Sequence, residues 1–269
     1  MQFVEVKHIA TNDVTIVSRE WVGGSCGTIV FIHGLGADQR QFESDASFFS
    51  GQGYNVVTLD LRGHGSSSIP WPSSRETLTV KAMAEDLLPL LDRVLQRPLH
   101  LVGNSLGGLV ALKLIDMRPD QVTSLTTLGT AYSLRLPKIV SVFGYWFGKL
   151  IGQKRFGQVI AKTATRNKPA RTLLAKMYEQ PNLTLIQIIH RNVCAYNYIG
   201  IAKAFTGPVL MVGGERDMVI NALADRSVRA FMEDPKFCNV RIANAGHFIN
   251  LDQPEKLREA LITFWNKTK

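Results

Sequence analysis

Three side chains that lie far apart along this chain have the types needed for nucleophilic catalysis. Ser105 lies in LHLVGNSLGGL (99–109), Asp217 ends the run GGERD, and His247 lies in NAGHF. A serine hydroxyl is a weak nucleophile until a base removes its proton, and a carboxylate that holds the base completes the group. We therefore expect a nucleophile, an orienting carboxylate and a base, in that chain order, which could together cleave an acyl bond.

The turn that carries Ser105 is expected to be very tight. A short apolar run at 99–102 is typical of a buried strand, and apolar residues at helical spacing follow from 106 to 117. Gly103 and Gly107 lack a Cβ where the strand and helix backbones must pass close together. Ser105 can then adopt a strained conformation that lifts its side chain out of the turn.

Other acids could take the place of Asp217. Glu215 and Asp225 are near it in the sequence. We favour Asp217, since a short carboxylate at a strand end suits the task of holding a histidine. Asp252 follows His247 and is predicted to face solvent.

Two further histidines, His33 and His64, also follow predicted strands, and we expect them to brace loops rather than to act as the base. The six histidines show no HExxH pattern and no pair at i, i+4, and the three cysteines show no CxxC pair. No metal site is predicted. Neither a P-loop nor a G-x-G-x-x-G pattern is present, so no cofactor is implied.

The elements that must position these residues alternate between strands and helices. We expect an opening hairpin at 3–8 and 14–19, then strands at 28–32, 54–59, 99–102, 122–128, 209–212 and 239–243. Helices are expected at 40–49, 80–95, 106–117, 221–232 and 254–265. This alternation predicts the α/β class, with a mostly parallel, doubly wound sheet whose reactive groups gather at the carboxyl ends of the strands.

Residues 131–206 interrupt the alternation. They separate two strands that ordinarily need a much shorter crossover, and they are expected to form helices at 159–165, 170–179 and 183–192. We predict a core domain formed by 1–130 and 207–269, with 131–206 inserted as a helical cap. This insert holds twelve Lys and Arg and one acid, Glu179, so its net charge is +11 within a chain whose total is +9.

The sequence resembles the α/β-hydrolase superfamily over nearly its full length. The matching runs are HGLG at 33–36, DLRGHGS at 60–66, GNSLG at 103–107, GERD at 214–217 and GH at 246–247. This resemblance implies that Ser105 is the nucleophile and that His247 is first general base and then general acid. It also implies that Asp217 fixes the histidine tautomer.

An attacking serine creates an oxyanion that needs prepared hydrogen-bond donors. The backbone N–H of Leu106, at the start of a helix, is expected to be one donor. The second is predicted to come from the loop after His33, from Leu35 or alternatively from Gly36.

The substrate pocket is expected to combine the core loops with the insert. The residues predicted to bind substrate are Gly34, Gly36, Asn104, Phe143, Trp146 and Phe248. The aromatic run at 136–151 implies an apolar acyl pocket, and the positive insert should attract anionic substrates or surfaces. These aromatics could instead sit with the neighbouring cations on a membrane surface. No nucleic-acid motif is present.

The predicted activity is hydrolysis of a carboxylic ester or thioester with an apolar acyl group, through an acyl-enzyme on Ser105. One alternative is a carbon–carbon bond hydrolase, whose GNSMGG turn is similar to GNSLGG, although Phe248 stands where those enzymes usually carry Trp. Another is a slow-turnover ligand receptor of the same fold, because the run HGLGADQ is similar to the corresponding run of such receptors.

The chain shows no signal peptide and no apolar run long enough to cross a membrane, so a cytoplasmic protein is expected.

Overall fold

An eight-stranded sheet forms the centre of the protein. The computed structural model describes residues 2–10, 14–93, 97–137, 139–165, 167–179 and 182–267, without the side chains of 139–144. Within these ranges the strand order is β1-β2-β4-β3-β5-β6-β9-β10. The strands are β1 (Val4–Ile9), β2 (Thr15–Trp21), β3 (Thr28–Ile32), β4 (Asn55–Leu59), β5 (Leu99–Asn104), β6 (Ser124–Leu128), β9 (Val209–Gly214) and β10 (Phe237–Ile242).

The sheet is mostly parallel. β1 pairs antiparallel with β2 and β2 antiparallel with β4, while every later pairing, from β4–β3 across to β9–β10, is parallel. Strands β3, β5 and β6 are buried along their whole length, as the continuous apolar runs predict. The catalytic candidates therefore lie on loops that leave one end of a rigid sheet.

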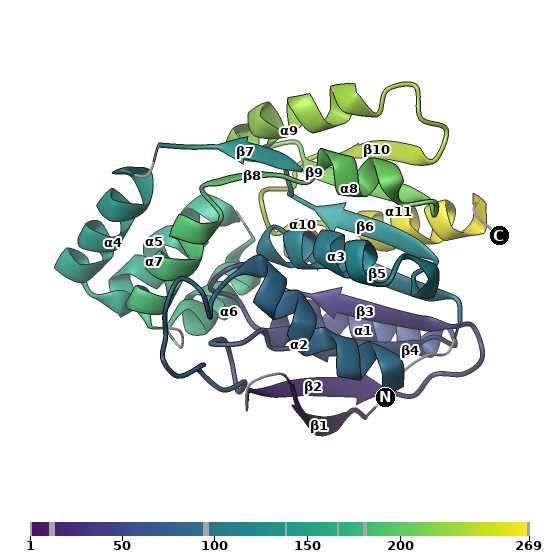
Figure 1. Cartoon of the computed structure of the whole chain (residues 1–269), viewed down its shortest axis with the longest axis horizontal. Helices are drawn as coiled ribbons and strands as arrows, with labels where there is room; N and C mark the ends of the chain where they lie inside the picture. Colours follow the sequence, from purple (N-terminus) through teal and green to yellow (C-terminus); the bar gives the residue numbers. More distant parts are fainter. Residues whose placement is uncertain are drawn as a thin grey trace.

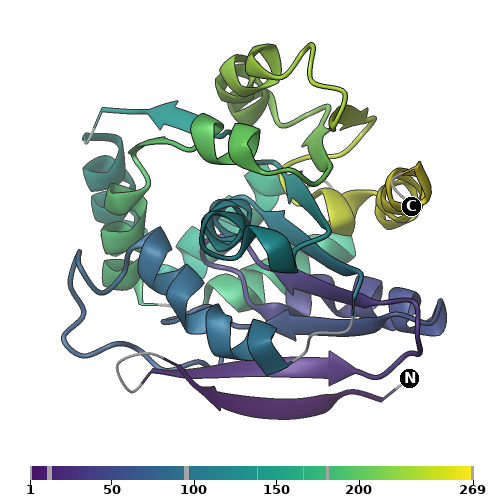
Figure 2. The same cartoon turned by 45° about the vertical axis from the view of Figure 1, so that its right-hand side comes forward.

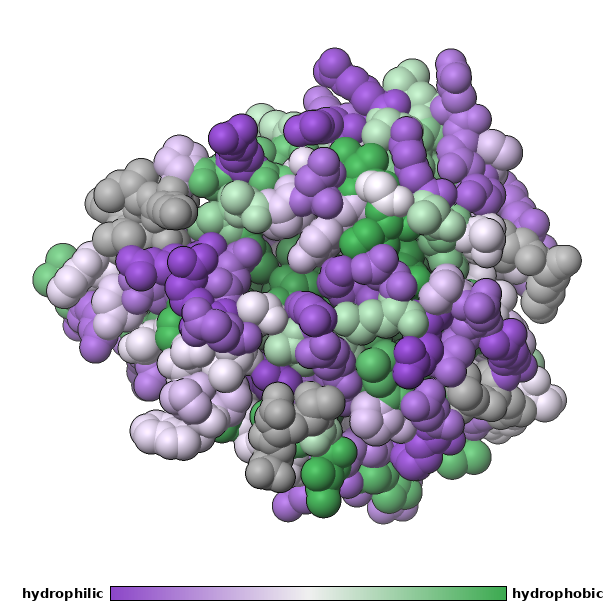
Figure 3. Space-filling view, in the orientation of Figure 1, coloured by the Kyte–Doolittle hydropathy of each residue, from purple (hydrophilic) through white to green (hydrophobic). Residues whose placement is uncertain are grey.

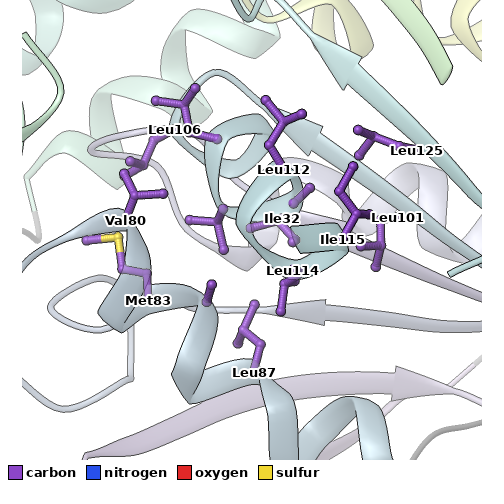
Figure 4. Packing of buried hydrophobic residues seen from close by; sticks show 14 of the residues in the cluster. Ile32, Val80, Met83, Leu87, Leu101, Leu106, Leu112, Leu114, Ile115 and Leu125 are labelled. Atoms are coloured by element: carbon purple, nitrogen blue, oxygen red, sulfur yellow. The ribbon is translucent and has the colours of Figure 1, made fainter. Parts of the chain in front are cut away.

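Helices cover both faces of this sheet (Figure 1). On one face α2 (Val80–Arg93), α3 (Leu106–Met117) and α9 (Met218–Ala230) contribute to one apolar cluster, part of which is shown in Figure 4. On the other face α1 (Glu43–Gly51) and α11 (Pro254–Lys267) pack in a second cluster that includes Phe49 and Trp265. The short helices are η2 (Gln39–Phe42), η3 (Pro119–Gln121) and α10 (Ile249–Asp252). The predicted doubly wound α/β fold is confirmed.

The segment between β6 and β9 is mainly helical. Its helices are α4 (Ile139–Ile151), α5 (Gln153–Ala164), α6 (Lys168–Tyr178), α7 (Leu183–Asn192) and α8 (Ile199–Ala204). In Figure 1 the helices α4 to α7 lie together at one end of the sheet, the end to which the parallel strands point. Figure 2 shows α4 and α7 side by side at the left of the turned view, where the two helices contact each other.

The base of the insert also contains a short pair of strands, which the sequence did not predict. β7 (Ser133–Arg135) and β8 (Ala195–Asn197) form a separate antiparallel pair, which joins the two ends of the insert. Strands of three residues carry too little pattern to be recognised from sequence, because their pairing is decided by segments far apart along the chain. No helix in the described residues is long and apolar enough to span a membrane.

Candidate active site

Ser105 lies at a strained turn between β5 and α3. Its backbone angles are φ 51° and ψ −112°, in a region that residues with a Cβ rarely adopt, and its N–H donates to Leu128 O at 2.8 Å. A Cβ on Gly103 would overlap the carbonyl of Gly107, and one on Gly107 would overlap that of Ile32. The close approach of strand and helix that the glycines predicted is therefore present.

His247 and Asp217 form a hydrogen-bonded pair. His247 Nδ1 lies 2.6 Å from Asp217 Oδ2, and the two side chains are 23% and 10% exposed. Asp217 follows β9 and directly precedes α9, whereas His247 follows β10, so adjacent parallel strands bring the pair together. With Nδ1 bonded to the carboxylate, the other ring nitrogen of His247 is left to exchange a proton with a nucleophile.

The acids weighed against Asp217 have other partners. Glu215 accepts a hydrogen bond from the Asn244 N–H at 2.9 Å, and Asp225 lies 3.7 Å from Arg241. Asn244 itself has φ 66°, a left-handed conformation that turns the chain just before the histidine loop.

One cavity of about 480 Å³ joins Ser105 and His247. Its other lining residues come from the core loops and from α4 to α7, and most of them are apolar. They are Gly34, Leu35, Phe248, Tyr145, Phe147, Phe156, Val159, Ile160, Tyr178, Leu183, Ile186, Gln187 and His190. None of these described lining residues is Lys or Arg, so the described cations of the insert lie outside the cavity lining.

The loop after β3 leaves two backbone donors available beside Ser105. The Gly34 N–H donates to Gln41 Oε1 at 3.1 Å, whereas the N–H groups of Leu35 and Gly36 have no acceptor within the described chain. A Cβ on Gly34 would lie 3.6 Å from that of Ser105, so this loop passes close to the serine. Leu106 is the first residue of α3, and its N–H also has no acceptor in the described part.

His33 and His64 are fully buried, and both rings hydrogen-bond to the backbone of the loops around them. His33 Nδ1 donates to Gly34 O at 2.8 Å, and its Nε2 accepts from the Leu61 N–H at 3.0 Å. Burial lowers the pKa of His33 and lowers that of His64 to about 3. Both rings are therefore neutral near pH 7, and neither lines the cavity.

Several residues predicted to bind substrate have other positions. Asn104 is fully buried, outside the cavity lining, and donates to the carbonyls of Leu128 and His247 at 3.0 and 3.2 Å. Trp146 is 65% exposed and is replaced in the lining by its neighbours Tyr145 and Phe147. We therefore correct the prediction of substrate contact for Asn104 and Trp146. The side chain of Phe143 lies outside the described residues.

Tyr178, on α6, holds the loop that carries the candidate oxyanion donors. Its hydroxyl donates to Leu35 O at 2.8 Å, and its ring covers Gly36, which has φ 77° and is not in the cavity lining. Gly36 is therefore predicted to meet the substrate only through its backbone N–H, as the alternative to Leu35 among the oxyanion donors. Burial raises the pKa of Tyr178, so its hydroxyl stays protonated as a donor. A tyrosine within an amphipathic helix gives no local sign of this task, which only the packing reveals.

The insert also contacts the loop that carries His247. The His247 N–H donates to Ala164 O at 3.1 Å, and the Gly246 N–H donates to Asp252 Oδ2 at 2.7 Å. The other oxygen of Asp252 accepts from the hydroxyl of Thr165, at the end of α5. Asp252 is therefore a link between the histidine loop and the insert, which corrects the prediction that it faces solvent.

Phe248 anchors the same contact from the core side. It is 1% exposed, meets the His247 ring edge-to-face at 5.5 Å between centroids, and packs in one cluster with Leu174, Met177 and Tyr178 of α6.

No group of three or more His, Cys, Asp or Glu that could hold a metal ion occurs in the described chain. The arrangement places a serine hydroxyl and a carboxylate-bonded histidine at one mostly apolar cavity, with backbone N–H groups in the adjoining loops.

Comparison with protein families identifies the group to which this arrangement belongs. Residues 23–252 match the family model described as serine aminopeptidase, S33. The chain belongs to the S33 family of hydrolases. As a member of S33 it is a hydrolytic enzyme of the α/β-hydrolase fold, and the resemblance drawn from the five sequence runs is confirmed.

Relatives of this S33 protein include enzymes named for ester substrates. It is 28% identical over 246 residues to 3-oxoadipate enol-lactonase 1 of Acinetobacter baylyi, covering 85% of this chain and 84% of that protein. It is 26% identical over 259 residues to an sn-1-specific diacylglycerol lipase of Mus musculus, covering 88% and 80%. Its fold matches that of a thermophilic esterase from Thermogutta terrifontis with a TM-score of 0.82 at 21% identity, covering 100% of this chain and 99% of that one.

Proposed function

We propose that this enzyme hydrolyses a carboxylic ester with an apolar acyl group through an acyl-enzyme on Ser105. The observation that carries the proposal is that Ser105 and the Asp217-bonded His247 open onto one cavity with mostly apolar walls. A lactone and a diacylglycerol, the substrates for which two relatives are named, both contain carboxylic ester bonds.

The first half of the reaction forms the acyl-enzyme. His247 removes the proton of the Ser105 hydroxyl as Oγ bonds to the ester carbonyl carbon, and Asp217 stabilises the imidazolium that results. The N–H groups of Leu106 and of Leu35 or Gly36 stabilise the oxyanion. When the tetrahedral intermediate collapses, the carbon–oxygen bond to the alcohol breaks, and His247 gives its proton to the leaving oxygen.

The second half returns the enzyme to its starting state. His247 removes a proton from water, the resulting hydroxide attacks the acyl carbon, and the bond to Ser105 Oγ breaks as the serine recovers its proton. The product is a carboxylic acid. No step calls for a metal ion or cofactor.

The core domain at 1–130 and 207–269 supplies this chemistry in our proposal, and the cap at 131–206 encloses the acyl group. A cavity of about 480 Å³ lies in the lower half of the usual range for small-molecule sites, so we expect an acyl chain of roughly six to ten carbons. The cytoplasmic location expected from the sequence stays a prediction.

The test is the hydrolysis of p-nitrophenyl esters from acetate to palmitate by the wild type, Ser105→Ala and Asp217→Asn. We expect an optimum at medium chain length and loss of activity in both variants. A folded wild-type protein that is inert on every ester would contradict the proposal. Cleavage of a carbon–carbon bond in a β-diketone, or saturable binding with a single slow turnover, would then support one of the two alternative functions.

A second property, weak contact of the cap with anionic membranes, is favoured by the outer face of α4 and α5. Trp146 and Leu150 are 65% and 84% exposed there, beside the exposed cations Lys149, Lys154 and Arg155. We expect sedimentation with phosphatidylglycerol vesicles, weakened by added salt and by Lys154→Glu with Arg155→Glu. Equal binding to phosphatidylcholine vesicles, or none at low salt, would contradict it.

A further inference from the structure

Helix α7 forms one wall of the cavity with four residues at helical spacing. Leu183, Ile186, Gln187 and His190 all line it, at i, i+3, i+4 and i+7. The opposite face of the helix, with Leu185 and Ile189, is buried in the main core. The orientation of α7 is therefore determined by packing, and its cavity face changes from apolar to polar toward its carboxyl end.

The two polar side chains at that end have little contact with protein partners. Within the described chain Gln187 makes no hydrogen bond, and the hydrogen-bond contact of the His190 ring is with Cys194 Sγ, 3.6 Å from Nδ1. Both side chains are half-buried. A polar group in an apolar wall costs free energy unless something hydrogen-bonds to it, so this pair is suited to a polar group on the bound molecule.

The charge of that group follows from the surroundings. No Lys or Arg is present among the described lining residues, so a carboxylate here would be desolvated without a counter-ion. Burial also lowers the pKa of His190, which keeps its ring neutral near pH 7. A neutral imidazole and a side-chain amide can each both donate and accept hydrogen bonds, so they can pair with a keto or a hydroxyl oxygen.

We propose that Gln187 and His190 bind an uncharged oxygen, a keto or hydroxyl group, on the acyl chain of the substrate. This inference rests on the proposed esterase function and makes it more specific. The scissile carbonyl is held by core loops at Leu35 and Leu106, whereas the polar pair belongs to α7, so the second oxygen lies along the chain, away from the reacting bond. The substrate class is an ester of an oxygenated medium-chain acid.

The experiment compares p-nitrophenyl octanoate with esters of the same chain that carry one keto group at successive carbons. We expect one keto position to raise kcat/KM about five- to ten-fold above octanoate, since a site built to hydrogen-bond discriminates against an analogue without the group. Gln187→Leu and His190→Leu should each bring that ratio close to one, whereas His190→Gln should keep part of it. Gln158→Leu is the matched control, because Gln158 is exposed on α5 outside the cavity lining.

Each result decides between the two proposals. Wild-type hydrolysis of octanoate with no preference for any keto ester would overturn this inference and leave the esterase function intact. A preference that persists in both leucine variants would overturn it as well. Failure to hydrolyse either kind of ester would overturn the esterase function and this inference together.

Discussion

The sheet core and the insert at 131–206 position their functional groups by different means. In the core, Ser105 and Asp217 follow the buried strands β5 and β9, His247 follows the edge strand β10, and the parallel register of these strands holds the loop ends in place. In the insert, the cavity-lining residues stand on amphipathic helices that pack on each other and, through Tyr178 and Thr165, on the core. In our proposal the core carries the reacting groups, and the insert forms most of the wall around the substrate.

Their charges differ in the same way. The insert carries +11, so the rest of the chain carries −2. Within the described residues, none of the insert's cations lines the cavity. On the face shown in Figure 3, hydrophilic side chains predominate and hydrophobic ones appear in smaller separate groups. The chemistry of the bound molecule is therefore inferred from the residues that line the cavity and not from the net charge of the insert.

The largest difference between the regions should appear on removing the nucleophile. Ser105→Ala should lower kcat for an ester by at least about 10⁴-fold, because no other group of the core can take its place. Phe156→Ala in the insert should instead shift the preferred chain length. Ser105→Gly should also lose activity but unfold with about 1 kcal/mol more free energy than Ser105→Ala, because glycine relieves the positive φ. Equal losses of kcat in Ser105→Ala and Phe156→Ala would contradict the idea that the core supplies the reacting groups while the insert only binds the acyl chain.

Acid should destabilise the core through His64. Its pKa of about 3 in the folded chain lies below the ordinary value of 6.5. Below pH 6.5 the unfolded chain takes up a proton that the folded chain does not, so the free energy of unfolding falls as pH drops, by up to about 1.4 kcal/mol per pH unit.

Urea unfolding of wild type and His64→Gln between about pH 4 and 8 measures this effect. The variant should show a shallower slope below pH 6.5, and His190→Gln, in the half-buried wall of the cavity, should change the slope less. Identical slopes in wild type and His64→Gln would mean that His64 is charged in the folded protein.

A smaller effect is expected at Gly129, which follows β6. Its φ is 53°, and a Cβ there would lie 3.1 Å from His247 Nδ1, so Gly129→Ala should displace the ring and lower kcat about three- to ten-fold. Gly152→Ala, between α4 and α5, is the control, because φ is 81° and nothing lies within 4 Å. Both variants should lose about 1 kcal/mol of stability from the left-handed backbone, and only Gly129→Ala should lose activity. A similar loss of kcat in the two would show that strain alone is responsible.

The smallest effect is expected where the two regions meet. Thr165→Val removes the hydroxyl that donates to Asp252 and should lower kcat about two- to five-fold, with the free energy of unfolding changed by about 1 kcal/mol. Thr163→Val is the matched control, since that hydroxyl donates only to carbonyls within α5 in the described chain. Equal kcat values for Thr165→Val and the wild type would show that the insert does not help to position the histidine loop.

Predictions from the sequence were closest for the buried core. The strand at 28–32 and the helix at 106–117 have the predicted bounds, and the other core elements differ by a few residues at their ends; in the insert, only the helix at 183–192 has the predicted bounds. Continuous apolar runs and glycines at close backbone contacts are local signals, so they can be recognised without knowledge of the partner segments. The same signals placed Ser105, Asp217 and His247 at strand ends, where the structure brings Asp217 and His247 into contact.

Only the tertiary structure decided which side chains meet across the two regions. The sequence by itself determined the parallel sheet, the strained turn and the residue types available for catalysis, because these follow from periodicity and from steric limits on the backbone. It did not determine that Tyr178 would hold Leu35, that Asp252 would face Thr165, or that Tyr145 and Phe147 rather than Trp146 would line the cavity. Such contacts depend on the rotation and tilt with which helices pack, and an amphipathic pattern specifies a buried face without naming its neighbour.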